Sequence, residues 1–308
     1  MTCPPSGEDR ARDHPAVKRD TEEGPKIMKA KTKEKDPEPN GPAPAPKGLP
    51  PKVTMDVKHV VLVLSGKGGV GKSTVATNLA SALAGHGRQV GLLDLDIHGP
   101  SIPKMLGIEN QQPAVLGRTM EPVRVTGKLS VMSMGFLLPD ASSPVIWRGP
   151  MKMAAIRQFL EDVNWGALDY LIVDLPPGTG DEALTIVQLA PNVRGAVIVT
   201  TPQDVAVIDA MKAVKFIEKL GLPVIGIIEN MSGMVCPHCG GTIDLFGSGG
   251  GRKAADDLHV PWLGAVPIDP EMVKAGDEGR PYVLRHADTP AWKAINAVME
   301  ILAKHVES

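Results

Sequence analysis

The sequence predicts an α/β fold with a doubly wound, mostly parallel sheet. From residue 57 onward, short apolar runs alternate with segments of helical periodicity, the pattern of strands joined by crossover helices. Most of these runs lack polar alternation, as expected for parallel strands covered by helices on both faces. A glycine-rich phosphate-binding motif, residues 65–74, lies between the first run and the first helical segment. These three observations predict one folded domain over residues 56–308.

The expected elements follow in order along this domain. The strands are expected at residues 57–64, 89–95, 129–134, 169–174, 195–200, 223–229 and 261–266. The helices are expected near residues 73–85, 149–162, 181–190, 204–219 and 289–306. In the first helix, Val75, Leu79 and Leu83 have helical spacing, and the glycines at its end stop it. Residues 242–246 are interpreted as one more short strand.

Residues 1–55 differ from the rest and are predicted to form a disordered tail. Eleven of the 29 prolines lie before residue 52, among many charges and few apolar residues. Such a segment cannot bury enough apolar surface to offset the entropy lost on ordering. Its acidic residues argue against an organelle transit peptide. Cys3 is an isolated thiol in this tail.

The composition limits the possible partners. The net charge is −2, so there is no basic surplus to favour nucleic acid. No apolar stretch approaches the roughly 20 residues that cross a membrane, and no apolar signal peptide opens the chain. Three cysteines are too few for a disulfide framework. We therefore expect a cytoplasmic protein that binds neither nucleic acid nor membrane.

The phosphate-binding motif predicts a nucleotide site. It fits G-x-x-x-x-G-K-[ST], with a β-branched strand before it and a helix after it. Glycines let successive N–H groups face one point, and the helix N-terminus adds partial positive charge there. Lys72 should reach the β- and γ-phosphates of ATP, and Ser73 should ligate Mg²⁺. The expected nucleotide-binding residues of the loop are Gly66, Lys67, Gly68, Gly69, Val70, Gly71, Lys72, Ser73 and Thr74.

Polar residues at the ends of three strands complete the predicted site, because ligands of such folds lie at the carboxyl ends of the strands. Asp94 and Asp96 close the second expected strand, and Asp96 is the better candidate to orient the attacking water. Asp174 ends another apolar strand and is assigned to the outer Mg²⁺ shell. Asn230 ends a third, where its amide could read the adenine edge.

A second lysine in the loop, Lys67, has no role in the general motif. Hydrolysis of ATP needs positive charge at the γ-phosphate, and Lys67 could supply it. Its position in the turn of the loop makes it hard for the side chain to curl back onto the same nucleotide. We expect Lys67 to reach across a dimer interface, as an arginine finger does in trans, with Lys67, Lys72 and Asp96 as the catalytic residues.

Cys236 and Cys239 form a C-x-x-C pair within an embedded segment of about residues 231–247. A thioredoxin-like redox site needs a helix after the first cysteine, and the following Gly240-Gly241 and the expected strand do not supply one. An incidental pair is the second alternative. The third is a metal knuckle, which supplies two of the four ligands that Zn²⁺ or a [4Fe–4S] cluster takes. No second C-x-x-C exists in the chain, so this reading predicts a homodimer with the metal between subunits. The spacing does not separate zinc from iron–sulfur.

The residues together resemble a known family. The loop K-G-G-V-G-K-S is similar to that of the deviant Walker A P-loop NTPases, which include MinD and ParA. Five further segments resemble the Mrp/ApbC-type iron–sulfur cluster carrier ATPases: D-L-D-I-H-G-P-S (94–101), W-R-G-P-M (147–151), D-L-P-P-G-T-G-D (174–181), E-N-M-S (229–232) and C-P-H-C-G (236–240). The resemblance covers roughly residues 57–306.

This resemblance implies an ATP-binding homodimer that holds a labile [4Fe–4S] cluster between subunits and passes it to apoproteins. It implies that Lys67 reaches the partner's nucleotide and that Cys236 and Cys239 hold the cluster. It also implies the roles given above to the phosphate loop, Asp96, Asp174 and Asn230. His98 departs from the family, which more often has Tyr there, and the tail carries neither a folded domain nor a four-cysteine site.

Two other functions remain as alternatives. A positioning ATPase of the MinD or ParA kind would need a membrane-binding last helix or a basic DNA surface. The apolar stripe of the last helix, with Ile295, Val298 and Leu302, is better interpreted as core. An ATP-dependent electron donor of the nitrogenase iron-protein type usually has two well-separated cysteines per subunit rather than a C-x-x-C pair.

Overall fold

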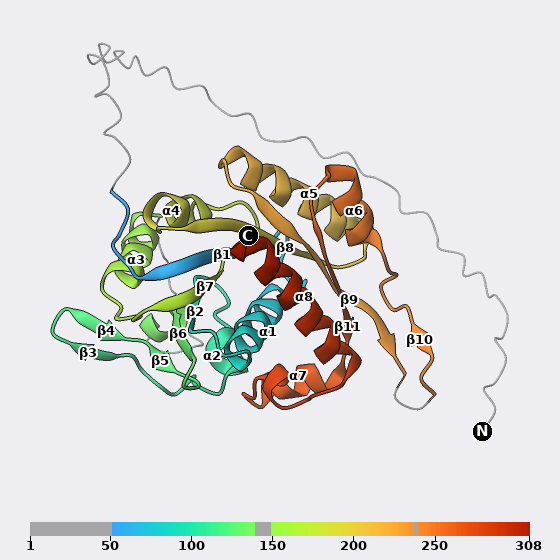
Figure 1. Ribbon diagram of the computed structural model, residues 1–308, viewed down its shortest axis with the longest axis horizontal. Coiled ribbons are helices and arrows are strands. Elements are labelled where there is room, and N and C mark those ends of the chain that lie inside the picture. Colours follow the sequence, from blue (N-terminus) through green and yellow to red (C-terminus); the bar gives the residue numbers. More distant parts are fainter. Residues whose placement is uncertain (1–50, 139–148, 237–238) are drawn as a thin grey trace, which may run out of the picture. The chain divides into compact units, whose positions relative to one another are not determined.

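The computed structural model describes residues 51–138, 149–236 and 239–308 (Figure 1). The predicted tail lies outside this part, except for residues 51–55. There the backbone N–H of Val53 donates to the carbonyl of Leu189, and the Val53 side chain is buried. The ordered domain therefore begins a few residues before the predicted boundary at residue 56. Trp147 and Arg148 of the predicted W-R-G-P-M motif lie outside the described residues.

The described part of the chain forms a nine-stranded sheet and a separate two-stranded hairpin. The strand order is β10-β9-β8-β1-β7-β2-β6-β5, and β11 also pairs with β9. The sheet strands are β1 (Val57–Ser65), β2 (Val90–Asp94), β5 (Val123–Arg124), β6 (Leu129–Ser133), β7 (Leu168–Asp174), β8 (Val193–Thr200), β9 (Val224–Val235), β10 (Thr242–Ile243) and β11 (Trp262–Ile268). The hairpin consists of β3 (Ala114–Leu116) and β4 (Thr119–Glu121).

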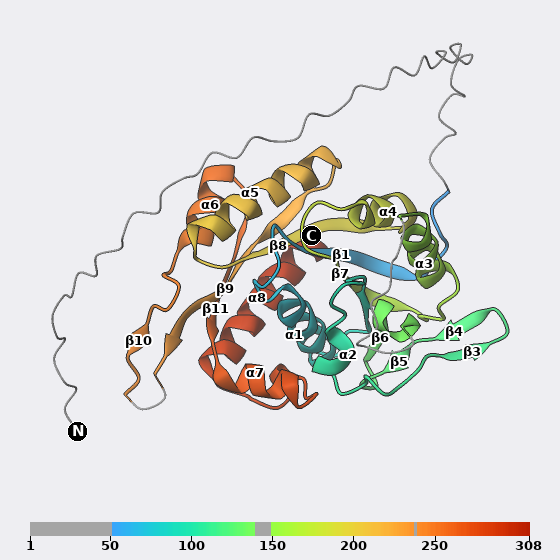
Figure 2. The ribbon, with the colours of Figure 1, turned by 180° about the vertical axis from the view of Figure 1, so that it is seen from behind.

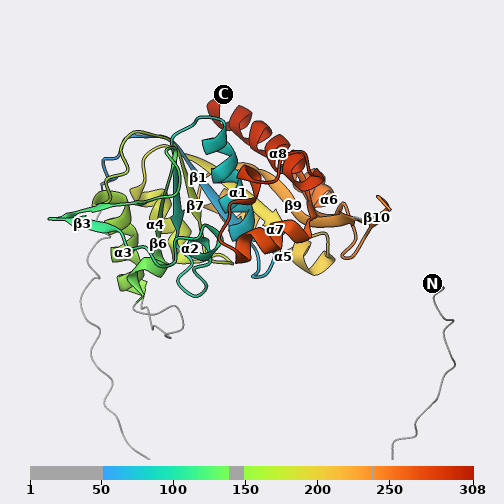
Figure 3. The same cartoon turned by 90° about the horizontal axis from the view of Figure 1, so that it is seen from below.

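The helices of the described residues cover both faces of this sheet. They are α1 (Lys72–Gly85), α2 (Ile102–Met105), α3 (Gly149–Glu161), α4 (Asp181–Leu189), α5 (Asp204–Lys219), α6 (Gly250–Leu258), α7 (Pro270–Asp277) and α8 (Pro290–Glu307), with 3-10 turns at Met134–Leu137 and Tyr282–Leu284. One core cluster packs α1 and α8 on the sheet, and the other packs α3 to α6. Figure 3 shows α1 and α8 on one side of the sheet and α3 and α5 on the other. The doubly wound fold is confirmed.

The pairing of the strands is mostly parallel, as predicted. Only the short strands β5 and β10 pair antiparallel in the main sheet, with β6 and β9. The chain order changes direction around β1, whose neighbours are β7 and β8. The carboxyl ends of β1, β2 and β7 therefore lie side by side, because all three run parallel in adjacent positions. That edge is where a doubly wound sheet binds its ligand.

Each of the seven strands predicted in the alternating pattern is present, with ends shifted by a few residues at most except in β9. The expected strand over 242–246 is shorter, because only Thr242 and Ile243 pair with β9. The β3–β4 hairpin and the helices α6 and α7 were not predicted. Both helices are short and bury only small residues, Gly251, Ala254 and Ala255 in α6 and Ala275 in α7, so no stripe of large apolar side chains marks them in the sequence.

The last helix, α8, packs its apolar stripe into the core, as predicted. Ile295, Val298, Met299 and Leu302 are each 4% exposed or less. Helix α8 lies against α1 and β11, which cover this stripe. Figure 2 shows the position of α8 beside α1. Among the residues that the structure describes, no helix is both long and apolar enough to cross a lipid bilayer.

Candidate functional site

The phosphate loop connects β1 to α1 at the carboxyl edge of the sheet. Gly69 and Gly71 have φ values of 84° and 79°, which only glycine adopts without strain. Gly71 precedes the first turn of α1, and no side chain caps that turn. The first N–H groups of a helix have no partner within the helix, so they remain directed at the loop. Two further loop residues pack inward: Gly66 against the backbone of Asp209, and Val70 within the core.

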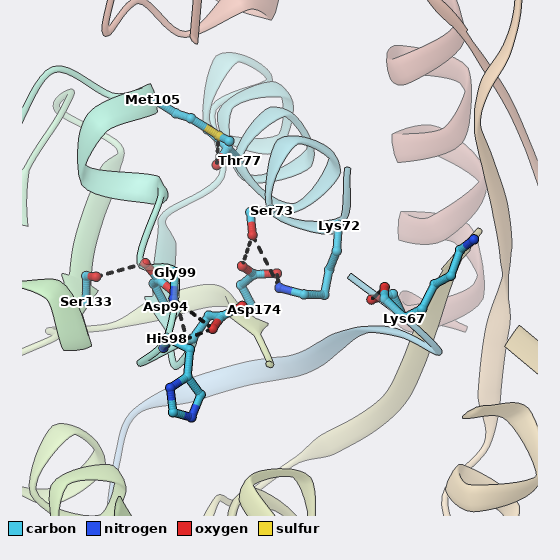
Figure 4. Close-up of polar contacts among 12 residues, drawn as sticks. Lys67, Lys72, Ser73, Thr77, Asp94, His98, Gly99, Met105, Ser133 and Asp174 are labelled. Carbon is cyan, nitrogen blue, oxygen red and sulfur yellow. Dashed lines mark hydrogen bonds and ion pairs between the residues drawn. The ribbon is translucent and has the colours of Figure 1, made fainter. Parts of the chain in front are cut away.

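The buried side chains of Lys72 and Asp174 and the half-buried Ser73 form one polar cluster at this loop (Figure 4). Lys72 Nζ lies 2.7 Å from Asp174 Oδ1, and Ser73 Oγ donates to Asp174 Oδ2 over 2.6 Å. Asp174 is fully buried and the Lys72 side chain is 6% exposed. The structure thus brings together the three residues that the sequence assigned to phosphate and Mg²⁺. A hydroxyl and a carboxylate are the oxygen donors that Mg²⁺ prefers.

A second buried carboxyl, Asp94, stands beside Asp174 because β2 and β7 pair these two residues in register. Its oxygens accept from the Ser133 hydroxyl at 2.8 Å and from the Asp96 N–H at 3.1 Å. Burial, and next the neighbouring Asp174 carboxyl, raise the pKa of Asp94 to about 8. Burial also raises the pKa of Asp174, although Lys72 opposes this shift. The sequence predicted the place of Asp94 at the end of its strand but no role for it in the site.

Asp96 lies past the end of β2, on the open side of the loop. It borders a pocket of about 180 Å³ that Lys72, Ser73 and Thr74 also line. Its Oδ1 accepts from the backbone N–H groups of His98, at 3.3 Å, and Gly99, at 3.2 Å. These two bonds orient the Asp96 carboxylate within the turn that follows β2. The predicted catalytic carboxylate and the phosphate loop therefore share one pocket, which Gly68, Gly69 and Gly71 also line.

Lys67 points away from this cluster. In Figure 4 its side chain extends to the side opposite Lys72 and Asp174, and its ammonium group reaches none of the other labelled residues. Its backbone carbonyl accepts from Ser65 Oγ at 2.9 Å, which holds the turn of the loop. The expected difficulty for Lys67 to act on its own nucleotide agrees with this orientation.

Asn230 contacts the phosphate loop directly. Its buried amide Nδ2 donates to the carbonyl of Val70 over 2.9 Å. A Cβ atom on Gly71 would lie 2.2 Å from this nitrogen, so the close approach requires glycine. The residue also borders a larger, mostly apolar cavity of about 540 Å³, next to the pocket of the loop. Its position at the nucleoside end of the site is compatible with the adenine role, which stays a prediction.

The large cavity continues the pocket of the loop. Thr74, Ser101 and Met105 line both. Its other walls come from Pro267 to Asp269 at the end of β11, from α7, and from the segment around Leu245 and Phe246. Apolar and polarisable walls of this kind suit the flat face of a base.

Cys236 and Cys239 lie at the tip of a hairpin formed by β9 and β10. The Cys236 N–H donates to the carbonyl of Gly241, and the Gly240 N–H donates to the carbonyl of Cys236, both over 2.9 Å. The residues between the two cysteines, Pro237 and His238, lie outside the described residues. Strand β10 follows the pair, so the helix that a thioredoxin-like site needs is replaced by a strand. Within residues 51–138, 149–236 and 239–308, no three His, Cys, Asp or Glu side chains gather into a metal site.

Glu229 fixes the base of this hairpin and was not predicted. It is buried, and its carboxylate accepts from the backbone N–H groups of Gly249, at 2.9 Å, and Gly251, at 2.6 Å. It also accepts from the Ser232 hydroxyl over 2.5 Å. The acceptor on β9 thus holds the chain that returns from the hairpin at the start of α6. The E-N-M-S segment offered a signal, since a Glu amid apolar strand residues needs buried donors.

A phosphate loop on a doubly wound sheet, with an acidic residue at the end of the adjacent strand, defines a P-loop NTPase. The second lysine places it in the deviant Walker A group. The model of one family, described as the ParA-type NUBPL iron-transfer P-loop NTPase, matches residues 56–303. The chain belongs to this family.

Three similar proteins agree with this assignment. An iron-sulfur cluster carrier protein of Methanocaldococcus jannaschii is 53% identical over 251 residues, which are 82% of this chain and 86% of that protein. A cytosolic Fe-S cluster assembly factor Nubp2 homolog of Anopheles gambiae is 49% identical over 250 residues, 80% of this chain and 96% of that protein. A solved nucleotide-binding protein of Archaeoglobus fulgidus, in complex with ADP, has a TM-score of 0.65 at 40% identity, covering 77% of this chain and 91% of its own.

Proposed function

We propose that this protein is an ATP-hydrolysing homodimer that carries a labile [4Fe–4S] cluster and transfers it to apoproteins. The observation that carries the proposal is the hairpin tip with Cys236 and Cys239. One chain offers two thiolates there, and the cluster takes four. A second copy of the chain supplies the missing pair. The names of the Methanocaldococcus and Anopheles relatives support iron–sulfur cargo over zinc.

The nucleotide site supplies the ATPase half of the proposal. Lys72, which pairs with Asp174, would reach the β- and γ-phosphates, and Ser73 Oγ would ligate the Mg²⁺ that accompanies ATP. Asp174, at the end of β7, would hold that ion through its water shell. When bound, Mg²⁺ neutralises phosphate charge, and hydrolysis then depends on positioning the water and on charge at the γ-phosphate.

Two residues of the chain act on the reacting atoms in this scheme. Asp96 orients the attacking water, with its carboxylate held by the backbone of His98 and Gly99. Lys67 of the second copy meets the γ-phosphate, because the Lys67 side chain points away from its own loop. A single chain therefore binds ATP, and only the dimer completes the catalytic site.

The partners and the location follow from the same function. The recipients are apo iron–sulfur proteins, and neither nucleic acid nor membrane takes part. We place the protein in the cytoplasm, which the cytosolic assembly factor of Anopheles supports. The positioning-ATPase alternative loses its membrane helix, because the stripe of α8 is buried in the core.

Anaerobic reconstitution with iron and sulfide tests the cargo. The full chain should gain the broad visible absorbance of a [4Fe–4S] cluster, at one cluster per pair of chains, and should activate an apo enzyme that depends on such a cluster. Cys236→Ala and Cys239→Ala should each lose the cluster. Cys3→Ala is the matched control and should keep it. A protein that retains only zinc, or activates no apo enzyme, would show the proposal to be wrong.

A further inference from the structure

The cysteine hairpin forms one wall of the cavity next to the phosphate loop. Leu245 and Phe246, on the arm that returns from β10, line the cavity of about 540 Å³ together with Asn230 and Met231. Leu245 is 56% exposed and Phe246 is 41% exposed. Much of their apolar surface is therefore left uncovered by the rest of the domain.

This cavity is where a nucleoside would lie once the phosphates occupy the loop. The cavity and the loop pocket share Thr74, Ser101 and Met105, so one ligand can extend from one into the other. A base placed there would pack against the uncovered faces of Leu245 and Phe246. Aliphatic and aromatic side chains are favourable packing surfaces for a flat ring. The same hairpin would then contact nucleotide on its arm and carry cysteines at its tip.

The base of the hairpin is fixed to the domain at two points. Glu229 accepts from the N–H groups of Gly249 and Gly251, and Asn230 donates to the carbonyl of Val70 in the phosphate loop. These bonds tie the beginning of the hairpin to α6 on one side and to the loop on the other. These contacts lie at the base and do not involve the part of the hairpin between the base and the tip.

Two glycines mark where that part begins and ends. Gly233 on β9 has a φ of 70°, and Gly247 on the returning arm has a φ of 80°. Backbone at such angles is relaxed only for glycine, and hinges concentrate at a few residues that can absorb φ and ψ changes. Between them, Ile243 pairs with Met234, and further bonds join Cys236 to Gly241. Residues 234–236 and 239–246 are therefore joined by backbone hydrogen bonds into one unit that includes both the wall and the cysteines.

We propose that the nucleoside positions the cysteine pair by packing against Leu245 and Phe246. Filling the cavity fixes the unit against its anchored base, so Cys236 and Cys239 hold one position when nucleotide is bound. This inference rests on the proposed function, since it takes the cavity as the nucleoside site, and it adds how nucleotide controls the cargo site. Linkage makes the coupling reciprocal, so a cluster on the cysteines changes nucleotide affinity by the same factor.

Alkylation of the cysteine pair tests this coupling. The full chain with Cys3→Ser, which leaves Cys236 and Cys239 as its only cysteines, is treated anaerobically with iodoacetamide. Rates are compared without ligand, with Mg-ADP and with Mg-tripolyphosphate, and binding of each is measured on the same samples. Mg-ADP should change the alkylation rate by about fivefold or more, the lower range of site-to-site coupling. Mg-tripolyphosphate fills the phosphate loop without a base and should leave the rate near that of the free protein.

A matched pair of variants assigns the effect to the wall. Phe246→Ala should lose most of the ADP effect on alkylation at saturating ADP. Ile243→Ala lies on the same hairpin, is 38% exposed and does not line the cavity, so it should keep the effect. An ADP effect that is absent in the parent protein, unchanged in Phe246→Ala, or fully reproduced by tripolyphosphate overturns the inference. Failure of the proposed function shows separately, as loss of ADP binding or as failure to reconstitute and transfer a cluster.

Discussion

Replacing Asp94 by asparagine should stabilise the ligand-free protein, and the gain should grow with pH. Asp94 is fully buried and close to Asp174, and its pKa is raised from 3.8 to about 8. Below pH 8 the folded protein thus keeps a proton on Asp94, while the unfolded chain releases it above pH 4. Folding therefore takes up a proton between pH 4 and pH 8. The contribution of Asp94 to the free energy of unfolding is fully present below pH 4 and is lost as the pH rises toward 8.

The size of the effect follows from that shift. Each pH unit between the two pKa values costs about 1.4 kcal/mol of unfolding free energy. At pH 7, about three units above the pKa of an ordinary aspartate, the ceiling is about 4 kcal/mol. Asparagine is uncharged at every pH and has nearly the shape of a neutral carboxyl, so it avoids this cost. It can still accept from the Asp96 N–H, one of the two contacts of Asp94.

Urea unfolding between pH 5 and 8, with a chelator and without nucleotide, measures this gain. Asp94→Asn should exceed the parent protein by a free energy that increases steadily across the range. Asp257→Asn, an exposed position on α6, is the control and should give a flat difference. A gap for Asp94→Asn that does not grow with pH, or a loss of stability at pH 7, would refute the assigned protonation state.

Two further predictions concern the phosphate loop. Lys67→Ala should keep ATP binding but hydrolyse ATP about 100-fold or more slowly, the cost of removing one positive group from the transition state. Lys215→Ala, at an exposed position on α5, is the control and should leave the hydrolysis rate unchanged. Full turnover in Lys67→Ala would exclude a lysine acting in trans. Gly71→Ala and Gly69→Ala share a positive φ, but only the Cβ at position 71 meets Asn230, at 2.2 Å. In urea unfolding, Gly71→Ala should therefore have a free energy of unfolding lower than that of Gly69→Ala by about 1 kcal/mol or more, because the added Cβ displaces the hydrogen bond from Asn230 to Val70. Equal free energies of unfolding would contradict this contact.

The sequence predicts the parallel core of this fold well because each of its strands has a recognisable pattern within a few consecutive residues. Strands such as β1 and β7 are continuous apolar runs, and apolar runs of that length are typical of buried parallel strands. The helices α6 and α7 carry no such pattern. α6 starts with two glycines and buries only Gly251, Ala254 and Ala255, so its stability depends on tertiary contacts such as the Glu229 carboxylate at its N-terminus. Contacts between distant segments of this kind leave no periodic signal.

In the candidate site, too, residues of a contiguous motif are predictable and residues brought together by tertiary contacts are not. Lys72 and Ser73 are predictable because the loop motif is contiguous and its chemistry is specific. The partnership of Asp94 with Asp174 depends on the register between β2 and β7, which are about 80 residues apart in the chain and give no pairing signal. Without that register, Asp94 and Asp96 are two aspartates of one short segment. The structure separates them into a fully buried carboxyl, Asp94, and a half-buried one, Asp96, that borders the pocket of the loop.

Strand β9 explains why one dimer could serve both the nucleotide and the cluster. At 12 residues it outruns its neighbour β8, whose pairing ends at Glu229, and its last residues continue past the carboxyl edge of the sheet. The phosphate loop lies at that same edge, joined to β9 by the bond from Asn230 to Val70. In a symmetric dimer both subunits use the same surface, so each subunit supplies to its partner the same groups that it receives. In the proposed dimer, the outward Lys67 and the two cysteines are the groups whose sites are incomplete in a single chain. Strand β9 runs from the contact of Asn230 with the phosphate loop to the hairpin that carries the cysteines.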